Sequence, residues 1–266
     1  MHLTMLGTGH AMVTECYNTC FTLQEDGLCF LVDGGGGNGI LRQLRHAGIT
    51  LGSVRTLFVT HRHVDHILGI VWMIRAICHA LHQGSYGGDA VVYGHDGVIA
   101  LLRDMAEKLL QKEETRFIGK RLHLITVRDG EQKTILGRQV TFFDMHSTKT
   151  KQFGFRMNLR DGEHLTCCGD EPCPPPAYPY AENSAWLLHE AFCLHSQADV
   201  FAPYEKRHST VRDACELAAR LNVRNLLLYH TEDRDMAHRK ERYREEGKQY
   251  YAGNLFVPDD LETIPL

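Results

Sequence analysis

The sequence has no large surplus of charge of either sign and no long apolar run. Its 29 Lys and Arg residues stand against 33 Asp and Glu residues, which gives a formal net charge of −4. This balance argues against a broadly basic surface that coats nucleic acid, although it leaves room for a local basic patch. No apolar run approaches the roughly 18 residues typical of a membrane helix, and the first residues lack the basic and apolar regions of a signal peptide. We therefore expect no membrane partner and a cytoplasmic location.

The sequence also lacks paired cysteines. Its 9 cysteines form no C-x-x-C pair and are scattered among 17 histidines. An odd, dispersed set argues against a disulfide framework and favours reduced thiols. The 266 residues are 43% hydrophobic and contain no repeat or long linker, so the chain can bury a sizeable core in one large domain.

Short β-rich runs alternate with helical patterns along the chain. The expected strands are His2–Leu6, Cys20–Gln24, Leu28–Val32, Thr56–Thr60, Ala90–Tyr93, His123–Val127, Gln139–Asp144, Phe153–Leu159, His164–Cys168, Ala185–Leu188 and Asn225–Leu228. The expected helices are Ile40–Ala47, Ile67–His82, Gly97–Leu110, Thr210–Leu221 and Asp235–Glu246. Hairpin signals lie at Glu25–Gly27, Arg128–Gly130 and Arg160–Glu163. Two strand-rich halves, each followed by helices, predict an α/β protein in which two sheets pack face to face with helices outside. We expect a single domain, residues 1–266, with internal pseudo-two-fold organisation.

Two other segments are distinctive in composition. The prolines of Cys173–Asn183 exclude a helix or a central strand, so we expect an ordered surface loop there. In the last expected helix, basic residues alternate with acidic ones at helical spacing, which is typical of a solvated face. Its basic residues could instead contact nucleic acid, but the interleaved glutamates argue against that. These residues are Arg239, Lys240, Arg242 and Arg244.

The segment THRHVDHILG places His61, His63, Asp65 and His66 directly after an apolar strand. A lone histidine is usually a surface or hydrogen-bonded residue, but this spacing is poorly explained by chance. A turn can aim all four side chains at one place, and two histidines with one carboxylate are the ligands of catalytic zinc. Four donors in six residues crowd a single tetrahedral ion, so the segment predicts two adjacent ions.

Three more metal-capable residues each close an apolar run: His146, Asp170 and His230. Because a strand delivers the residue at its end to the sheet edge, they can join the cluster. Taken singly, His146 could be a loop residue and Asp170 a turn former; the repetition favours ligands. Asp33 also follows a strand, and it could either accept a hydrogen bond from a ligand histidine or form a turn.

This pattern resembles the metallo-β-lactamase superfamily and, more narrowly, ribonuclease Z. The motifs keep that family's order along nearly the whole chain, and only Ile70–Gly137 carries none. They are LGTG (Leu6–Gly9), LVDGG (Leu31–Gly35), THRHVDH, HST (His146–Thr148), FGFR (Phe153–Arg156), CGD (Cys168–Asp170), LHEAF (Leu188–Phe192), HST (His208–Thr210) and LYHTE (Leu228–Glu232). The resemblance implies a four-layer αββα sandwich that holds two divalent metal ions.

The resemblance also implies a role for each donor. One ion would be held by His61, His63 and His146, and the second by Asp65, His66 and His230, with Asp170 bridging the two. Asp65 is expected in the catalytic set as well. The donors favour Zn²⁺, with Mn²⁺ and Fe²⁺ as alternatives. The ions would activate water to attack a phosphodiester.

A further pair is implied to protonate the leaving group. The resemblance assigns His208 as general acid and Glu190 as the carboxylate that orients it. The alternative is a buried salt bridge that ties a strand end to the Thr210–Leu221 helix. A thioester, lactone or β-lactam hydrolase of the superfamily is less favoured, because it needs no such pair.

Two departures from the family bear on the substrate. The acidic DCGEGT segment of the family is here DGGGGNG, Asp33–Gly39. Members that process transfer RNA carry a long Gly/Pro-rich arm where this chain has only Met157–Cys168. The expected partner is therefore a phosphodiester, either an RNA 3′ end or a small nucleotide ester such as a cyclic nucleotide. The missing arm and the acidic charge favour the small ester, and the resemblance leaves a homodimer open.

Overall fold

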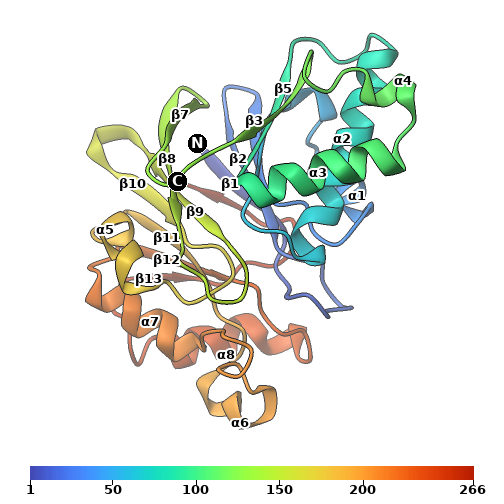
Figure 1. The fold of residues 1–266 in the computed structure, drawn as a ribbon. Helices are drawn as coiled ribbons and strands as arrows, with labels where there is room; N and C mark the ends of the chain where they lie inside the picture. The colour runs from blue at the N-terminus through green and yellow to red at the C-terminus, as the bar shows by residue number, and fades with distance from the viewer. The chain divides into compact units, whose positions relative to one another are not determined.

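The computed structural model describes residues 1–266, which divide into two compact units interleaved in sequence. Unit 1 comprises Met1–Gly7, Tyr17–Arg128 and Asp260–Leu266, and unit 2 comprises Thr8–Cys16 and Asp129–Asp259. Each unit contains one seven-stranded mixed sheet covered by helices (Figure 1). The expected α/β class is therefore confirmed, and the single-domain description stays a prediction.

The sheet of unit 1 has the strand order β14-β1-β2-β3-β4-β5-β6. Its strands are β1 His2–Gly7, β2 Cys20–Glu25, β3 Leu28–Val32, β4 Val54–Val59, β5 Ala90–Gly94, β6 Leu122–Thr126 and β14 Thr263–Pro265. Strands β3 to β6 run parallel, so helices must connect them. These helices are α1 Gly39–His46, α2 Val64–His82, α3 Asp96–Leu109 and α4 Lys112–Thr115. Figure 1 shows them gathered beside the sheet, and the apolar side chains of α1, α2 and α3 form one buried cluster with β3 to β6.

The sheet of unit 2 has the order β13-β12-β11-β10-β9-β8-β7. Its strands are β7 Gln132–Ile135, β8 Arg138–Asp144, β9 Phe153–Asn158, β10 His164–Cys167, β11 Trp186–Glu190, β12 Asn225–Tyr229 and β13 Asn254–Phe256. Its helices are α5 Tyr178–Ala181, α6 Ala198–Phe201, α7 Val211–Arg220 and α8 Met236–Gly247. Strands β10 to β13 are parallel, which brings the carboxyl ends of β10, β11 and β12 to one edge.

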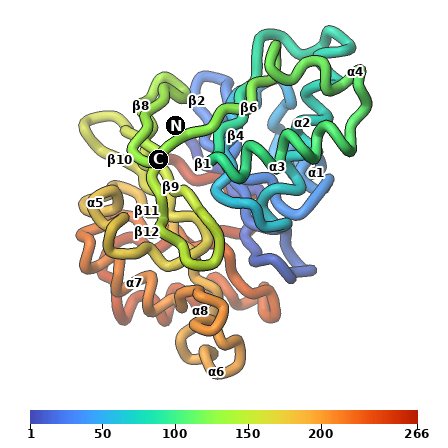
Figure 2. The backbone as a smooth tube through the Cα atoms, in the orientation of Figure 1, coloured from blue at the N-terminus to red at the C-terminus, as the bar shows by residue number.

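Every expected strand and helix is present, with ends shifted by up to three residues. The sequence did not reveal β7, β13, β14, α4, α5 and α6, all of them four residues or shorter. The prolines of Cys173–Asn183 do not exclude a helix: α5 forms with a proline in its first turn, where no backbone N–H is needed. Arg128–Gly130 is not a hairpin, because it carries the chain from β6 of unit 1 to β7 of unit 2. Figure 2 follows this crossing in green.

Helix α2 corrects two expectations. It begins at Val64 rather than near Ile67, so Asp65 and His66 lie in its first turn and not in a preceding loop. It is also long and apolar enough to span a membrane by length and composition, with a mean hydropathy of 1.5. Within unit 1 it is a core helix, because most of its apolar side chains pack in the buried cluster and 61% of that window is buried. None of the 9 cysteines forms a disulfide, as expected.

Candidate metal centre

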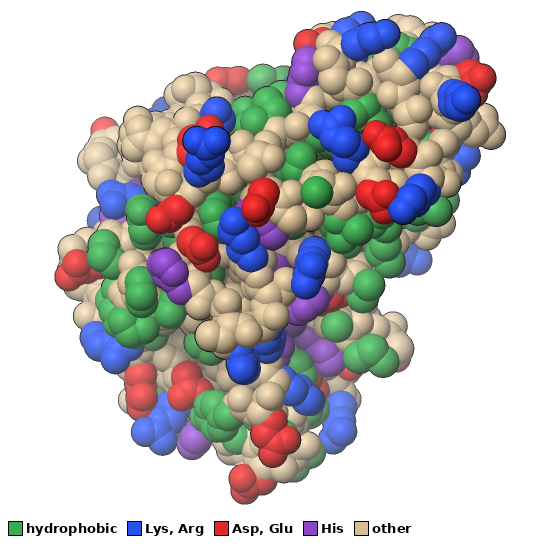
Figure 3. Space-filling view, viewed as in Figure 1, with side chains coloured by type: hydrophobic (Ala, Val, Ile, Leu, Met, Phe, Trp, Pro, Cys, Tyr) green, Lys and Arg blue, Asp and Glu red, His purple; other side chains and the backbone are tan.

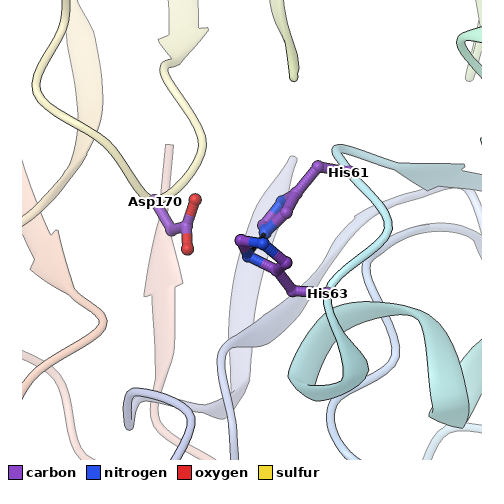
Figure 4. Close-up of side chains that lie close together, drawn as sticks. All are labelled: His61, His63 and Asp170. Carbon is purple, nitrogen blue, oxygen red and sulfur yellow. Dashed lines mark hydrogen bonds between the residues drawn. The ribbon is translucent and has the colours of Figure 1, made fainter. Parts of the chain in front are cut away.

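The histidine-rich segment of unit 1 changes from strand to helix within four residues. Strand β4 ends at Val59, and His63 has the extended backbone of a helix N-cap (φ −66°, ψ 151°). The rings of His61 and His63 project from this short connection toward each other (Figure 4). The His61 Nε2 and His63 Nδ1 atoms lie 2.9 Å apart. Two imidazole nitrogens aimed at the same point are the arrangement that a shared metal ion requires.

Asp33 organises the other half of this segment. Its carboxylate accepts hydrogen bonds from the backbone N–H and the hydroxyl of Thr60, both at 2.8 Å. It also lies 2.8 Å from His66 Nδ1, so the proton of that imidazole is placed on Nδ1 and the acceptor lone pair on Nε2. His66 Nε2 is 3.3 Å from Asp65 Oδ2. The first of the two roles considered for Asp33, a hydrogen-bond acceptor for a candidate ligand, is confirmed.

The glycine-rich segment after Asp33 lets the backbone approach α2 closely. The Gly34 N–H donates to His66 O at 2.9 Å, and the Gly69 N–H donates to Gly35 O at 2.9 Å. A Cβ on Gly34 or Gly69 would collide with the backbone of the other segment. These glycines therefore fix the first turn of α2, which carries Asp65 and His66, against the end of β3.

Two candidate ligands of unit 2 follow the carboxyl ends of β10 and β12, the two strands on either side of β11. Asp170 lies on the loop that follows β10 (Figure 4), and His230 directly follows β12. Both are buried, and His230 Nε2 lies 3.5 Å from Asp170 Oδ2. The side-chain amide of Gln152 donates to Asp170 Oδ1, which fixes the carboxylate. A buried carboxylate and imidazole are donors that suit a divalent transition metal.

His146 differs from these two residues. Its side chain is exposed, and its backbone N–H donates to Asp144 Oδ1 at 2.7 Å in a left-handed conformation (φ 50°). Its role as a metal ligand stays a prediction.

Glu190 and His208 face each other inside unit 2. His208 Nδ1 is 3.6 Å from Glu190 Oε2, which is too long for a hydrogen bond, and the Ser209 N–H donates to Glu190 Oε1. The His208 ring stacks on Phe192 at 5.1 Å and lies 5.1 Å from the His230 ring. Burial raises the pKa of Glu190 well above its ordinary value. Burial, together with the neighbouring His230 imidazole, lowers the pKa of His208 to about 3. Both shifts favour the uncharged form of each group, a protonated Glu190 and a neutral His208.

His189 is a structural residue that the sequence did not reveal. It is fully buried on β11, donates from Nδ1 to Glu190 O at 2.7 Å and accepts at Nε2 from the Cys173 N–H at 3.1 Å. It thus fastens the proline-rich segment next to Asp170. Burial lowers the pKa of His189 to about 4. The only sequence signal was its place within an otherwise apolar strand.

The His189 pKa predicts a pH dependence of stability. His189 binds a proton near pH 6.5 in the unfolded chain and only near pH 4 in the folded chain. Its contribution to the stability of the fold is therefore complete above pH 6.5 and is lost as the pH falls to 4. The expected loss is about 3 kcal/mol in the free energy of unfolding. Urea unfolding of chelated protein at pH 7.5 and 4.5 should show a smaller pH dependence for His189→Gln. Equal pH dependence in the two proteins would contradict the assignment.

Comparison with known proteins identifies the family of the chain. The family model of the anti-Pycsar protein Apyc1 matches residues 1–250. Ribonuclease Z of Methanothermobacter thermautotrophicus is 27% identical over 312 aligned positions, which cover 99% of this chain and 96% of the relative. Ribonuclease Z of Thermobifida fusca is 26% identical, with 98% of this chain and 93% of the relative covered. Because this chain has only 266 residues, the 312-position alignment contains segments that it lacks.

Solved structures share the fold. The metallo-β-lactamase fold protein YhfI of Bacillus subtilis superposes with a TM-score of 0.79 at 18% identity, covering 99% of this chain and 98% of YhfI. The short form of human tRNase Z gives a TM-score of 0.73 at 21% identity, covering 100% of this chain and 99% of that protein. The predicted metallo-β-lactamase fold is confirmed. The chain belongs to the anti-Pycsar protein Apyc1 family and is a ribonuclease Z-like, metal-dependent hydrolase of the metallo-β-lactamase superfamily.

Proposed function

We propose that the protein hydrolyses small phosphodiesters with two divalent metal ions, most simply Zn²⁺. In this proposal the first ion would be held by His61, His63 and His146, and the second by Asp65, His66 and His230, with Asp170 as a ligand common to both. The observation that carries the proposal is that each unit contains candidate metal ligands whose side chains are oriented by hydrogen bonds from residues outside the ligand set. Asp33 orients His66, and Gln152 fixes Asp170. Donor orientation of this kind is typical of functional metal sites.

The bound ions would supply a nucleophilic hydroxide near neutral pH and neutralise charge on the phosphate. The chain's own residues perform the remaining tasks. Asp33 keeps the His66 proton on Nδ1, so that Nε2 would be the atom offered to a metal ion. The charge of Lys149 lowers the pKa of both Glu190 and His208, so this lysine is within electrostatic reach of the pair. Lys149 is therefore a candidate contact for the substrate phosphate.

Glu190 and His208 supply the proton for the leaving group. Glu190 carries the proton as a buried carboxylic acid, while neutral His208 directs Nδ1 toward it. As the leaving oxygen gains negative charge, the Nε2–H of His208 is transferred to it and Nδ1 accepts the proton of Glu190. Glu190 ends as a carboxylate and the leaving oxygen as a hydroxyl. The 3.6 Å separation must shorten when substrate binds, as is common for catalytic contacts.

The substrate class follows from the absence of the basic surface that binding a large nucleic acid requires. Only Met157–Cys168 stands where transfer-RNA-processing relatives carry an arm, and this segment is the β9–β10 hairpin. Basic and acidic side chains are interspersed on the face shown in Figure 3. Without a basic clamp, affinity must come from the phosphate at the metals, which suits a small nucleotide ester. The pair Glu190–His208 also favours a phosphodiester over a thioester or β-lactam.

The proposal includes a homodimer through unit 1. Val64, Trp72 and Leu109 are apolar side chains with 62%, 37% and 65% exposure. Trp72 and Leu109 line a cavity of about 340 Å³ whose walls include the ion pair of Arg75 with Glu114. A two-fold interface brings the same surface of two copies together. An apolar patch that has a positive and a negative side chain beside it is complementary to a second copy of itself. Val64 lies between His63 and Asp65, so a second copy of the chain would cover the neighbourhood of these ligands.

The cytoplasm is the proposed location, because the cysteines form no disulfide and oxidising compartments favour disulfides.

The proton-transfer role predicts a dependence on the leaving group. His208→Ala should lower turnover of a diester with an alkoxide leaving group by about 10²–10⁴-fold. The loss should be much smaller for bis-p-nitrophenyl phosphate, because p-nitrophenolate leaves without protonation. Metal content, measured by mass spectrometry, should be unchanged, and His195→Ala provides a half-buried control at the start of a short 3-10 helix. Equal losses on both substrates would mean that His208 is structural.

A further inference from the structure

Arg239 is a buried cation in a helix that the sequence predicts to be solvated. It lies on α8, whose neighbouring basic residues are exposed or half-buried, yet Arg239 is 2% exposed. The expected solvated face is therefore wrong at this position, and Arg239 cannot contact nucleic acid. Burying a guanidinium is costly unless its N–H groups are paired, so its partners indicate why it is there.

The guanidinium connects three separate segments of unit 2. Its Nη1 donates to the hydroxyls of Thr8, at 3.0 Å, and Thr231, at 2.8 Å. Its Nη2 donates to Pro258 O at 2.6 Å and lies 2.9 Å from Asp259 Oδ1. The planar fork of arginine suits such multiple contacts, whereas a lysine ammonium would act as a single point charge.

Two of these segments flank the candidate ligand His230. The Thr231 N–H donates to Thr8 O, and the His10 N–H donates to Thr231 O, both at 3.0 Å. Thr8 and Thr231 are both buried. His230 itself adopts the left-handed conformation (φ 58°), which a non-glycine residue keeps only when its surroundings enforce it. The guanidinium and the paired backbones hold Thr231, the residue that directly follows His230.

We propose that Arg239 is a positioning residue for the second metal ion, because it holds the Thr8–His10 loop and the His230–Thr231 segment together. The proposal rests on the proposed metal-binding role of His230. Loss of the guanidinium would free the backbone of His230 to leave the left-handed region, and the imidazole would no longer point in one direction. Loss of comparable outer contacts at metal sites lowers metal affinity by about 10–100-fold.

The test measures metal affinity rather than activity. Chelated wild type, Arg239→Met and Arg239→Lys are titrated with Zn²⁺ against a chromophoric competitor, and bound zinc per chain is counted. Lys240→Met is the matched control, because Lys240 adjoins Arg239 on α8 and lies 3.2 Å from the same Asp259 carboxylate, but is 30% exposed. Thr231→Val removes one acceptor and serves as a milder variant if Arg239→Met fails to fold.

We expect Arg239→Met to keep one tight zinc ion and to bind the second about 10–100-fold more weakly. Arg239→Lys should recover this affinity only in part, and Lys240→Met should match wild type. Second-site affinity equal to wild type in Arg239→Met, or in Thr231→Val if the former does not fold, would overturn the proposal whatever the melting temperature. A wild type that binds two ions but cleaves no phosphodiester would overturn the proposed function and leave this test valid.

Discussion

Replacing Asp170 by asparagine is expected to abolish phosphodiester hydrolysis and to remove at least one metal ion. The loss in turnover should exceed the ~100-fold that loss of an outer contact costs, because a neutral amide cannot balance the charge of two cations. The substitution keeps the size of the side chain. It also places the asparagine amide beside the Gln152 amide, which in the wild type donates a hydrogen bond to the Asp170 carboxylate. His230 Nε2, 3.5 Å from Asp170 Oδ2, would lose its carboxylate neighbour.

The measurement is kcat on bis-p-nitrophenyl phosphate together with bound metal per chain. Asp161→Asn is the control, since Asp161 is exposed on the β9–β10 hairpin and adopts a left-handed conformation that asparagine tolerates. An Asp170→Asn protein that kept two ions and wild-type turnover would exclude Asp170 as the bridging ligand.

The second large effect concerns substrate size. We expect hydrolysis of small diesters, including 2′,3′-cyclic nucleotides, with cleavage of a precursor transfer RNA at least about 100-fold less efficient at physiological salt. A folded transfer RNA is held by phosphate contacts spread over many nucleotides, and its binding weakens steeply with salt when those contacts are few. The assay compares kcat/KM for both substrates at 50 and 200 mM salt, with a β-lactam as a further arm.

Oligomeric state is measured on the same preparation, because a second copy could supply basic surface that one chain lacks. A dimer in sedimentation velocity, lost on Trp72→Glu, would support the apolar face of unit 1 as the interface. A monomer would remove the dimer from the proposal. Efficient, site-specific cleavage of the transfer RNA precursor would show that the substrate prediction is wrong.

The strands and the candidate ligands could be predicted from sequence because each depends on local order along the chain. An apolar run that ends in a polar residue fixes where Asp170 and His230 emerge, whatever the rest of the fold. Asp33 could be suspected for the same reason, although only the structure shows that His66 is its partner. Short edge strands such as β13 and β14 carry too few residues to show a periodic pattern.

Arg239 and His189 could not be predicted, since their environment comes from distant segments. The helical spacing of charges predicts that α8 is solvated. It does not show that Arg239, one of the arginines of α8, is buried by contacts with Thr8 and Pro258. His189 has an apolar neighbourhood in sequence, and its acceptor role depends on the Cys173 N–H sixteen positions away. The raised pKa of Glu190 follows from burial, which a motif does not reveal.

The most direct test of the dinuclear site is anomalous diffraction at the zinc edge from crystals of the zinc-loaded protein. The proposal predicts two peaks about 3.5–4 Å apart. Asp170 should contact both peaks, His61 and His63 should contact one, and His66 and His230 the other. A single peak, or two peaks without Asp170 and His230 among their ligands, would contradict it.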